Sequence, residues 1–229
     1  NKMNPIPPNS EPMGYNAVLL GATGLVGSSV LQELIEDERC QNVALLTRKS
    51  LGTLSPKVHE ILVDFDQLSD WTFPFKPDVL INCIGTTRKK TPSLQAYEAI
   101  DIGIPVSVAK LLLPIGCDEI HLVSSVGAKA NAKNFYLKIK GTVEESMKAL
   151  PASTVCIYRP SMLMGNRKEF RFGEGIGRML TPLFDLFTFH GKYHSIKDKQ
   201  VAKSIRANIK TRPPGQYVLH YPEMKAPRS

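Results

Sequence analysis

The chain has 229 residues, of which 42% are hydrophobic and 22% are charged, a composition typical of a globular protein that buries one sizeable core. Its longest apolar runs, such as residues 79–85, end well before the roughly 18 apolar residues that a membrane-spanning helix needs. These features exclude a transmembrane protein, and we predict no membrane partner.

The net charge of +8 is unevenly distributed along the sequence. Residues 1–115 hold 10 Lys and Arg against 12 Asp and Glu, whereas residues 116–229 hold 19 against 9. The second half therefore either binds something anionic or carries a solvated basic face. Because the basic residues are not interleaved with aromatic ones, as they are in single-strand binders, we predict no nucleic-acid partner.

The first 14 residues contain four prolines and no apolar segment of the kind that an export signal carries. We therefore expect a flexible N-terminal arm over residues 1–14, a single domain over residues 15–229, and a cytoplasmic protein.

Short runs rich in Val, Ile and Leu alternate with segments of helical period, which is typical of a parallel sheet wrapped by crossover helices. The expected strands lie near residues 16–20, 43–47, 58–63, 78–83, 119–123, 154–158 and 217–220. The expected helices lie near residues 25–37, 93–113, 134–149, 173–188 and 195–209. We predict an α/β fold: one Rossmann-like, doubly wound parallel sheet with a small C-terminal cap over about residues 160–215, placed above the carboxyl edge where such folds bind ligands.

A glycine loop, Gly21-x-x-Gly24-x-x-Gly27, follows the first expected strand and opens a helix. Glycines at such a junction permit a tight turn, a close approach of backbone to a pyrophosphate, and close packing of helix on strand. A purely structural turn is the alternative. The position directly after an N-terminal strand favours dinucleotide binding.

The second expected strand ends in Leu46-Thr47-Arg48-Lys49. An NAD site usually has an acidic residue near this point, which accepts hydrogen bonds from the ribose hydroxyls. Here two cations take that place, and the planar guanidinium of Arg48 suits a 2′-phosphate. We therefore predict NADP(H) as the cofactor, with a solvated basic turn as the alternative.

The ends of the next two strands add weaker indications. Asp64 follows the third strand, where a carboxylate can meet an adenine amino group, and Gly85 lies between Ile84 and Thr86 after the fourth. A glycine there lets the chain pass close to a cofactor, although Asp and Gly are also common turn residues.

Three Tyr-x-x-x-Lys pairs occur in the chain: Tyr136/Lys140, Tyr193/Lys197 and Tyr221/Lys225. The first lies on the helix that follows the fifth strand, and that strand ends in Ser124-Ser125. Residues four apart share a helix face, so the lysine can lower the high pKa typical of a phenol while a serine hydroxyl holds a substrate oxygen. This context favours a proton relay at Tyr136 and Lys140 over a surface helix. Tyr193 has no strand-end serine before it, and Tyr221 precedes Pro222 in the C-terminal tail.

The four cysteines and five histidines show no metal-binding pattern. Cys40, Cys83, Cys117 and Cys156 contain no CxxC pair, and we interpret them as core thiols. His190 and His194 are four apart but have no third ligand nearby, so we predict no metal.

The glycine loop, Ser124-Ser125, Tyr136-x-x-x-Lys140 and Arg159-Pro160, in that order, resemble the motifs of the atypical short-chain dehydrogenases/reductases. Leu46-Thr-Arg48-Lys, Gly85-Thr-Thr-Arg88 and Tyr158-Arg-Pro-Ser-Met-Leu are more narrowly similar to the Tat-interacting protein family of NADPH-binding oxidoreductases and its bacterial relatives. The match runs from about residue 16 to beyond residue 200.

This resemblance implies an NADPH-binding Rossmann fold and a set of cofactor contacts. The phosphate loop would be Thr23, Gly24, Leu25 and Val26, the adenosine-phosphate contacts Arg48 and Lys49, and the nicotinamide-side positions Ile84, Gly85, Tyr136, Lys140, Leu163 and Arg171. Two departures from the family pattern are Ser161, which stands in place of a glycine, and Leu25-Val26, which replaces a more polar pair.

Two functions from different classes fit this sequence. The first is an NADPH-dependent oxidoreductase that transfers hydride to or from the carbonyl or alcohol carbon of a small-molecule substrate. In it Tyr136 is the general acid/base, Lys140 tunes it, and Ser125 or Ser124 orients the substrate. The alternative is an NADPH-sensing regulatory binding protein with little or no turnover, which acts through a protein partner. A nucleotide-sugar epimerase or dehydratase uses the same relay but usually has a larger substrate domain.

Overall fold

The computed structural model describes residues 14–52, 55–65, 72–86, 91–161, 163–164 and 196–225, with the backbone alone at 163–164. The strands of the main sheet are β1 (Tyr15–Leu20), β2 (Cys40–Thr47), β3 (Val58–Leu62), β4 (Val79–Asn82), β5 (Glu119–Val123), β6 (Thr154–Tyr158) and β9 (Gly215–Leu219). They form one seven-stranded sheet in the order β3-β2-β1-β4-β5-β6-β9, and every neighbouring pair is parallel. The order reverses between β1 and β4, which confirms the predicted doubly wound Rossmann-like fold.

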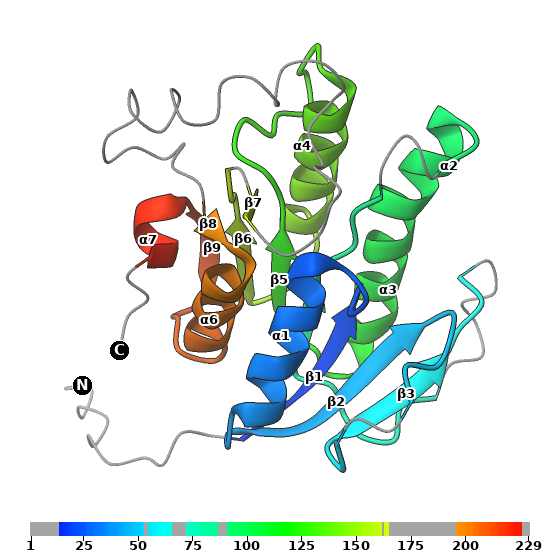
Figure 1. The fold of residues 1–229 in the computed structure, drawn as a ribbon, viewed down its shortest axis with the longest axis vertical. Helices are drawn as coiled ribbons and strands as arrows, with labels where there is room; N and C mark the ends of the chain where they lie inside the picture. The colour runs from blue at the N-terminus through cyan, green and yellow to red at the C-terminus, as the bar shows by residue number, and fades with distance from the viewer. Residues whose placement is uncertain are drawn as a thin grey trace, which may run out of the picture.

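Helices cover both faces of this sheet (Figure 1). On one face lie α1 (Leu25–Glu36), α6 (Asp198–Asn208) and the short α7 (Tyr221–Lys225). On the other lie α3 (Ile104–Leu112) and α4 (Phe135–Lys148). The chain enters α3 through α2 (Leu94–Glu98) and a π-helical turn (Ala99–Gly103), and it leaves through a 3₁₀ turn (Leu113–Ile115).

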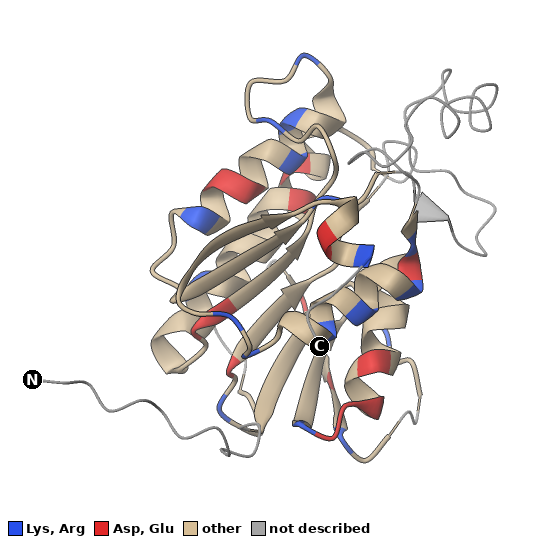
Figure 2. Ribbon diagram, turned by 90° about the vertical axis from the view of Figure 1, so that its left-hand side faces the viewer, with Lys and Arg blue, Asp and Glu red and all other residues tan. Residues whose placement is uncertain are grey.

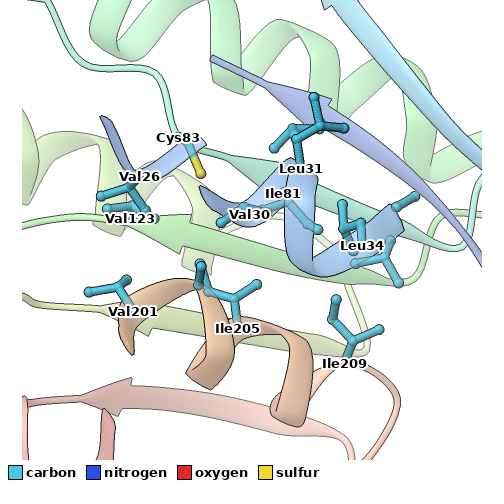
Figure 3. Packing of buried hydrophobic residues seen from close by; sticks show 14 of the residues in the cluster. Val26, Val30, Leu31, Leu34, Ile81, Cys83, Val123, Val201, Ile205 and Ile209 are labelled. Carbon is cyan, nitrogen blue, oxygen red and sulfur yellow. The ribbon is translucent and has the colours of Figure 1, made fainter. Parts of the chain in front are cut away.

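Successive strand residues alternate between two hydrophobic cores, as the two-residue period of a strand requires. Leu19 and Ile81 face the α1 and α6 side, whereas Leu20 and Leu80 face the α3 and α4 side. Figure 3 shows the first of these cores, where Val30 and Leu34 of α1 and Val201 and Ile205 of α6 pack toward the sheet. Because both faces are covered, the central strands are apolar on both sides.

Polar bonds also join α1 to α6, although the two helices lie far apart in the sequence. Ser29 Oγ donates a hydrogen bond of 2.5 Å to Asp198, and Arg206 lies 3.0 Å from the carboxylate of Glu33. Arg39, just beyond α1, donates to the carbonyl oxygens of Arg206 and Ile209 at the end of α6. The two helices therefore form one layer.

The region of the predicted cap differs from expectation where the structure describes it. Two short strands, β7 (Leu163–Met164) and β8 (Ile196–Lys197), pair in parallel and lie on either side of residues 165–195 in the sequence. Residues 198–219 then form α6 and β9, which belong to the main sheet and its helix layer. The helix predicted near residues 173–188 lies outside the described residues, so a cap above the carboxyl edge stays a prediction.

The helix predicted over residues 93–113 is interrupted by the π-helical turn. Pro105 lies within the first turn after it. Proline has no backbone N–H, and its ring clashes with the carbonyl four residues earlier, which here is that of Asp101. The Ile104 N–H instead bonds to Ala99 O, five residues back. The π-helical turn accommodates Pro105 without ending the helix.

The burial of the cysteines agrees with their interpretation as core thiols. All four cysteines are buried and free of disulfides, and burial raises the pKa of Cys40 to about 11 and that of Cys117 and Cys156 to about 12. Figure 2 shows Lys and Arg interspersed with Asp and Glu over the helices. Within the described ranges, no helix is long and apolar enough to cross a membrane.

Candidate functional site

The glycine loop connects β1 to α1 and touches the end of β4. Gly21 has a φ of +80°, and a Cβ built there would lie 2.7 Å from the carbonyl atoms of Cys83. A Cβ at Gly27 would lie 2.0 Å from Gly21 O, because the first turn of α1 packs directly on the loop. Gly24 is the N-cap of α1 and provides no side-chain cap. The N-terminus of α1 therefore follows a tightly packed glycine loop and has no side-chain cap, and uncapped helix N-termini of this kind bind phosphate groups in other proteins.

The side chains of the phosphate-loop residues implied by the resemblance differ in their exposure to solvent. Thr23 is exposed, Leu25 is half-buried and Val26 is buried in the core under α1. Since the side chain of Val26 packs inward, only its backbone is placed to meet a phosphate. The replacement of a more polar pair by Leu25-Val26 therefore does not alter the backbone N–H groups at the N-terminus of α1.

The predicted adenosine-phosphate residues lie beside this loop. Thr23, Thr47, Arg48 and Lys49 line one hollow of about 380 Å³ between the glycine loop and the end of β2. The side chains of Arg48 and Lys49 are exposed, and Thr47 Oγ1 donates a hydrogen bond of 2.8 Å to Lys49 O. This hydrogen bond from Thr47 stabilises the turn. Thr47 was not among the predicted site residues.

A second unpredicted residue, Glu60 of β3, orders the segment after Lys49. Its carboxylate accepts hydrogen bonds from Ser50 Oγ at 2.6 Å and from Leu51 N at 2.5 Å. The hydrogen bond from Ser50, followed by that from Leu51, lowers the pKa of Glu60. Asp64 lies just past β3, where Val63 N donates to Thr47 O; its side chain is exposed at the same sheet edge.

The predicted nicotinamide-side residues meet at the end of β4. Lys140 Nζ donates to Ile84 O at 3.3 Å and lies 3.3 Å from Asp101 Oδ2. Asp101 Oδ1 accepts from Thr86 N at 2.8 Å, with Gly85 between the two bonded residues. The side chains of Lys140 and Asp101 are 5% and 0% exposed. The structure thus brings Ile84, Thr86 and Lys140 together and adds Asp101, which no sequence motif indicated.

The two strand-end serines have different surroundings. Ser124 Oγ donates to Glu144 Oε1 at 2.5 Å, and the same fully buried carboxylate binds Arg159 through Nε at 2.9 Å and Nη2 at 2.5 Å. The hydrogen bond to Glu144 raises the pKa of Arg159. Ser125 Oγ donates only a long bond of 3.3 Å to Val126 O. The hydroxyl of Ser124 is therefore committed to a structural ion pair, whereas that of Ser125 is weakly held.

Tyr136 is the second residue of α4 and is half-buried. The N-cap Asn134 accepts a hydrogen bond from Leu137 N, and Lys129 N donates to Leu137 O, so the loop after β5 is tied to this first turn. Tyr136 and Lys140 lie one turn apart on α4, as predicted. Tyr221 and Lys225 instead lie on α7 at the other end of the sequence, with the ammonium 5.8 Å from the ring centroid.

Some predicted residues cannot be placed around this site. Leu163 lies in β7 and is described by its backbone alone, while Arg171, His190 and His194 lie outside the described residues. Among the residues that the structure does describe, no group of three or more His, Cys, Asp or Glu is placed to hold a metal ion.

No protein-family model matches the chain, but curated proteins do. It is 35% identical over 191 residues to the protein FMP52 of Meyerozyma guilliermondii and covers 82% of each sequence. It is also 32% identical over 164 residues to the protein HTATIP2 of Rattus norvegicus, covering 70% of this chain and 67% of that one. These matches confirm the family resemblance read from the motifs.

Solved structures resemble the fold at lower identity. The oxidoreductase ylbE from Lactococcus lactis superposes with a TM-score of 0.62 at 18% identity, covering 90% of each chain. MoeE5, solved in complex with UDP-glucuronic acid and NAD, gives a TM-score of 0.64 at 16% identity, covering 89% of this chain and 75% of that one. The chain thus has the Rossmann-like fold of NAD(P)-dependent oxidoreductases and epimerases.

The comparisons contradict one prediction. The fungal relatives are named mitochondrial proteins, so the predicted cytoplasmic location was wrong. That prediction excluded an apolar export signal, which differs physically from the amphipathic, basic segments of mitochondrial import. The lack of an apolar export signal therefore gives no information about import into mitochondria.

Proposed function

Because this chain belongs to the family of the FMP52 and HTATIP2 proteins, we propose that it is an NADPH-dependent oxidoreductase of the short-chain dehydrogenase/reductase type. Its substrate is a small molecule with a carbonyl or alcohol group. A mitochondrial location, as in the names of its fungal relatives, is part of the proposal.

The hollow between the glycine loop and the end of β2 carries this proposal. Gly21 and Gly27 let the loop pack directly on β4 and on the first turn of α1, since a Cβ at either would clash with backbone. The N-terminus of α1 that follows has no side-chain cap, and such an uncapped helix N-terminus suits a cofactor phosphate. Arg48 and Lys49 line the same hollow, at the strand end where an NAD site usually has a carboxylate. Two exposed cations there favour a 2′-phosphate.

The residues at the ends of β4 and β5 have separate roles in this proposal. The bound NADPH supplies the hydride. Tyr136 donates a proton to the substrate oxygen during reduction and accepts it during oxidation. Lys140 holds the nicotinamide ribose, and Ser125 donates a hydrogen bond to the substrate oxygen. Ser124 supports this site through its bond to Glu144.

The experiment that tests the proposal is a thermal melt with NADPH, NADP⁺, NADH and NAD⁺. A ligand that binds the native state raises the melting temperature by mass action, so we expect a selective rise with the two phosphorylated forms. Absence of a rise with all four overturns the proposal. Tight NADPH binding without reduction of any compound in a carbonyl panel favours the alternative of a regulatory, NADPH-sensing protein.

Reversing the charge of Arg48 should change the cofactor preference. We expect Arg48→Asp to weaken NADPH binding by about tenfold or more, since a hydrogen-bonded charge contributes roughly 1.5–3 kcal/mol, and to spare NADH. Isothermal titration with both cofactors measures this. Lys110→Asp, the same charge change on an exposed residue at the far end of α3, should leave both affinities unchanged. An unaltered NADPH preference in Arg48→Asp contradicts the assignment.

Replacing each of the two serines should affect a different property: stability for Ser124 and turnover for Ser125. Ser124→Ala removes a hydrogen bond to a buried carboxylate, so we expect a loss of about 1–3 kcal/mol in the free energy of unfolding. Ser125→Ala should lower turnover by roughly 10²-fold, as loss of one substrate-oxygen donor does elsewhere, with little change in stability. Urea unfolding and steady-state kinetics of both variants test this, and the opposite pattern would reassign the two residues.

A further inference from the structure

The buried carboxylate of Asp101 joins two parts of the candidate site. One oxygen, Oδ1, accepts from Thr86 N at 2.8 Å, and the other, Oδ2, lies 3.3 Å from Lys140 Nζ. Tyr97 OH holds the same segment by donating to Thr86 O at 2.9 Å. Asp101 thus connects the backbone after β4 with the lysine of α4.

The π-helical turn explains how a helix residue reaches this position. The turn carries one more residue than an α-helical turn, so Asp101 is offset from its place in an unbroken helix. Pro105 causes the offset because its ring excludes an α-helical bond to the carbonyl of Asp101. Such single π turns are frequent at functional sites.

The ion pair with Asp101 also neutralises the buried positive charge of Lys140. Its ammonium has three donor hydrogens and donates one to Ile84 O. Asp101 Oδ2, 3.3 Å away, is its ion-pair partner without a hydrogen bond. A buried ammonium without a counter-ion loses its charge or moves to solvent. With Asp101 in place, the lysine stays buried and keeps a donor for the nicotinamide ribose.

We propose that Asp101 is a positioning residue that holds the ammonium of Lys140 and the Ile84–Thr86 backbone in place for the nicotinamide half of the cofactor. This inference rests on the proposed function. It requires that Asp101 act through Lys140, without contact to the substrate, and that its effect be confined to that half of the cofactor. The adenosine half, bound near Arg48 at the other end of the site, should be insensitive to it.

The test compares two ligands on one variant. Asp101→Asn keeps an oxygen that can accept from Thr86 N and removes the charge facing Lys140. By isothermal titration we expect NADPH to bind roughly tenfold more weakly, while adenosine 2′,5′-bisphosphate, which lacks the nicotinamide half, binds as it does to the wild type. A matched control is Asp78→Asn, because Asp78 likewise accepts from a backbone N–H, that of Asn16 at 2.8 Å, but lies at the opposite sheet edge. It should alter neither affinity.

The outcomes separate this inference from the proposed function. If the wild type binds neither ligand, both fail. If the wild type binds both and Asp101→Asn binds NADPH unchanged, or loses both ligands equally, Asp101 has no positioning role and the proposed function stands.

A double variant covers the case in which Asp101→Asn folds poorly. Asp101→Asn/Lys140→Met removes both buried charges and leaves neither uncompensated. If Asp101 acts through Lys140, the double variant binds NADPH no more weakly than Lys140→Met alone. A further loss of about tenfold in the double variant overturns the inference.

Discussion

Turnover should fall by about 10²- to 10⁴-fold when Tyr136 is replaced by phenylalanine, the range over which a positioned proton donor contributes. The change removes one oxygen and keeps the half-buried ring, so the first turn of α4 and its cap at Asn134 should persist. Because Lys140 and the glycine loop are untouched, NADPH affinity should stay within a few-fold of the wild type. Steady-state kinetics on a substrate found in the carbonyl panel, together with titration of NADPH, measure both quantities.

The matched control is Tyr221→Phe. Tyr221 belongs to another Tyr-x-x-x-Lys pair, with Lys225 near its ring, but it lies on α7. Loss of its hydroxyl should leave turnover unchanged. Retention of full activity in Tyr136→Phe, or an equal loss in both variants, would remove Tyr136 from the mechanism.

The second large effect is expected for Gly27→Ala. The new methyl group would lie 2.0 Å from Gly21 O, which forces the first turn of α1 away from the loop. We expect the free energy of unfolding to fall by about 1–3 kcal/mol, as overpacking does in other cores. NADPH binding should fall at least tenfold, because the amide groups that face the phosphates are displaced.

Gly103→Ala is the control for that experiment. A Cβ at Gly103 meets nothing within 4 Å, and its backbone is right-handed helical. Alanine there should be neutral or stabilise by about 0.4–1 kcal/mol through the unfolded chain. Thermal melts with and without NADPH separate the two changes. An intact NADPH-dependent rise in Gly27→Ala would show that the loop does not hold the phosphates.

Short apolar runs predicted the sheet well because the central strands are buried on both faces. The bounds expected near residues 119–123 and 154–158 agree with β5 and β6. β2 begins three residues before the predicted start because Cys40 and its neighbours pair with β1. The two-residue strands β7 and β8 are too short for any period to appear.

The local sequence patterns of the candidate site lie on the elements where they were expected. The glycine loop and Arg48 follow β1 and β2, and Tyr136 and Lys140 lie on α4. Their roles in binding and catalysis stay predictions. Asp101 and Glu144 were missed because their partners, Lys140 and Arg159, are brought to them by the packing of α4. One local signal was present for Asp101: a proline four residues later in an expected helix.

The bonds between α1 and α6 have a consequence for the order in which the molecule folds. Ser29 and Asp198 are 169 residues apart, so a ribosome finishes the glycine loop long before it makes the helix that covers α1. Until then the apolar flank formed by Val30 and Leu34 lacks its contacts with Ile205 and Ile209. Non-local pairings of this kind form late and slowly. Nucleotide binding during synthesis should therefore appear only after α6 has left the ribosome.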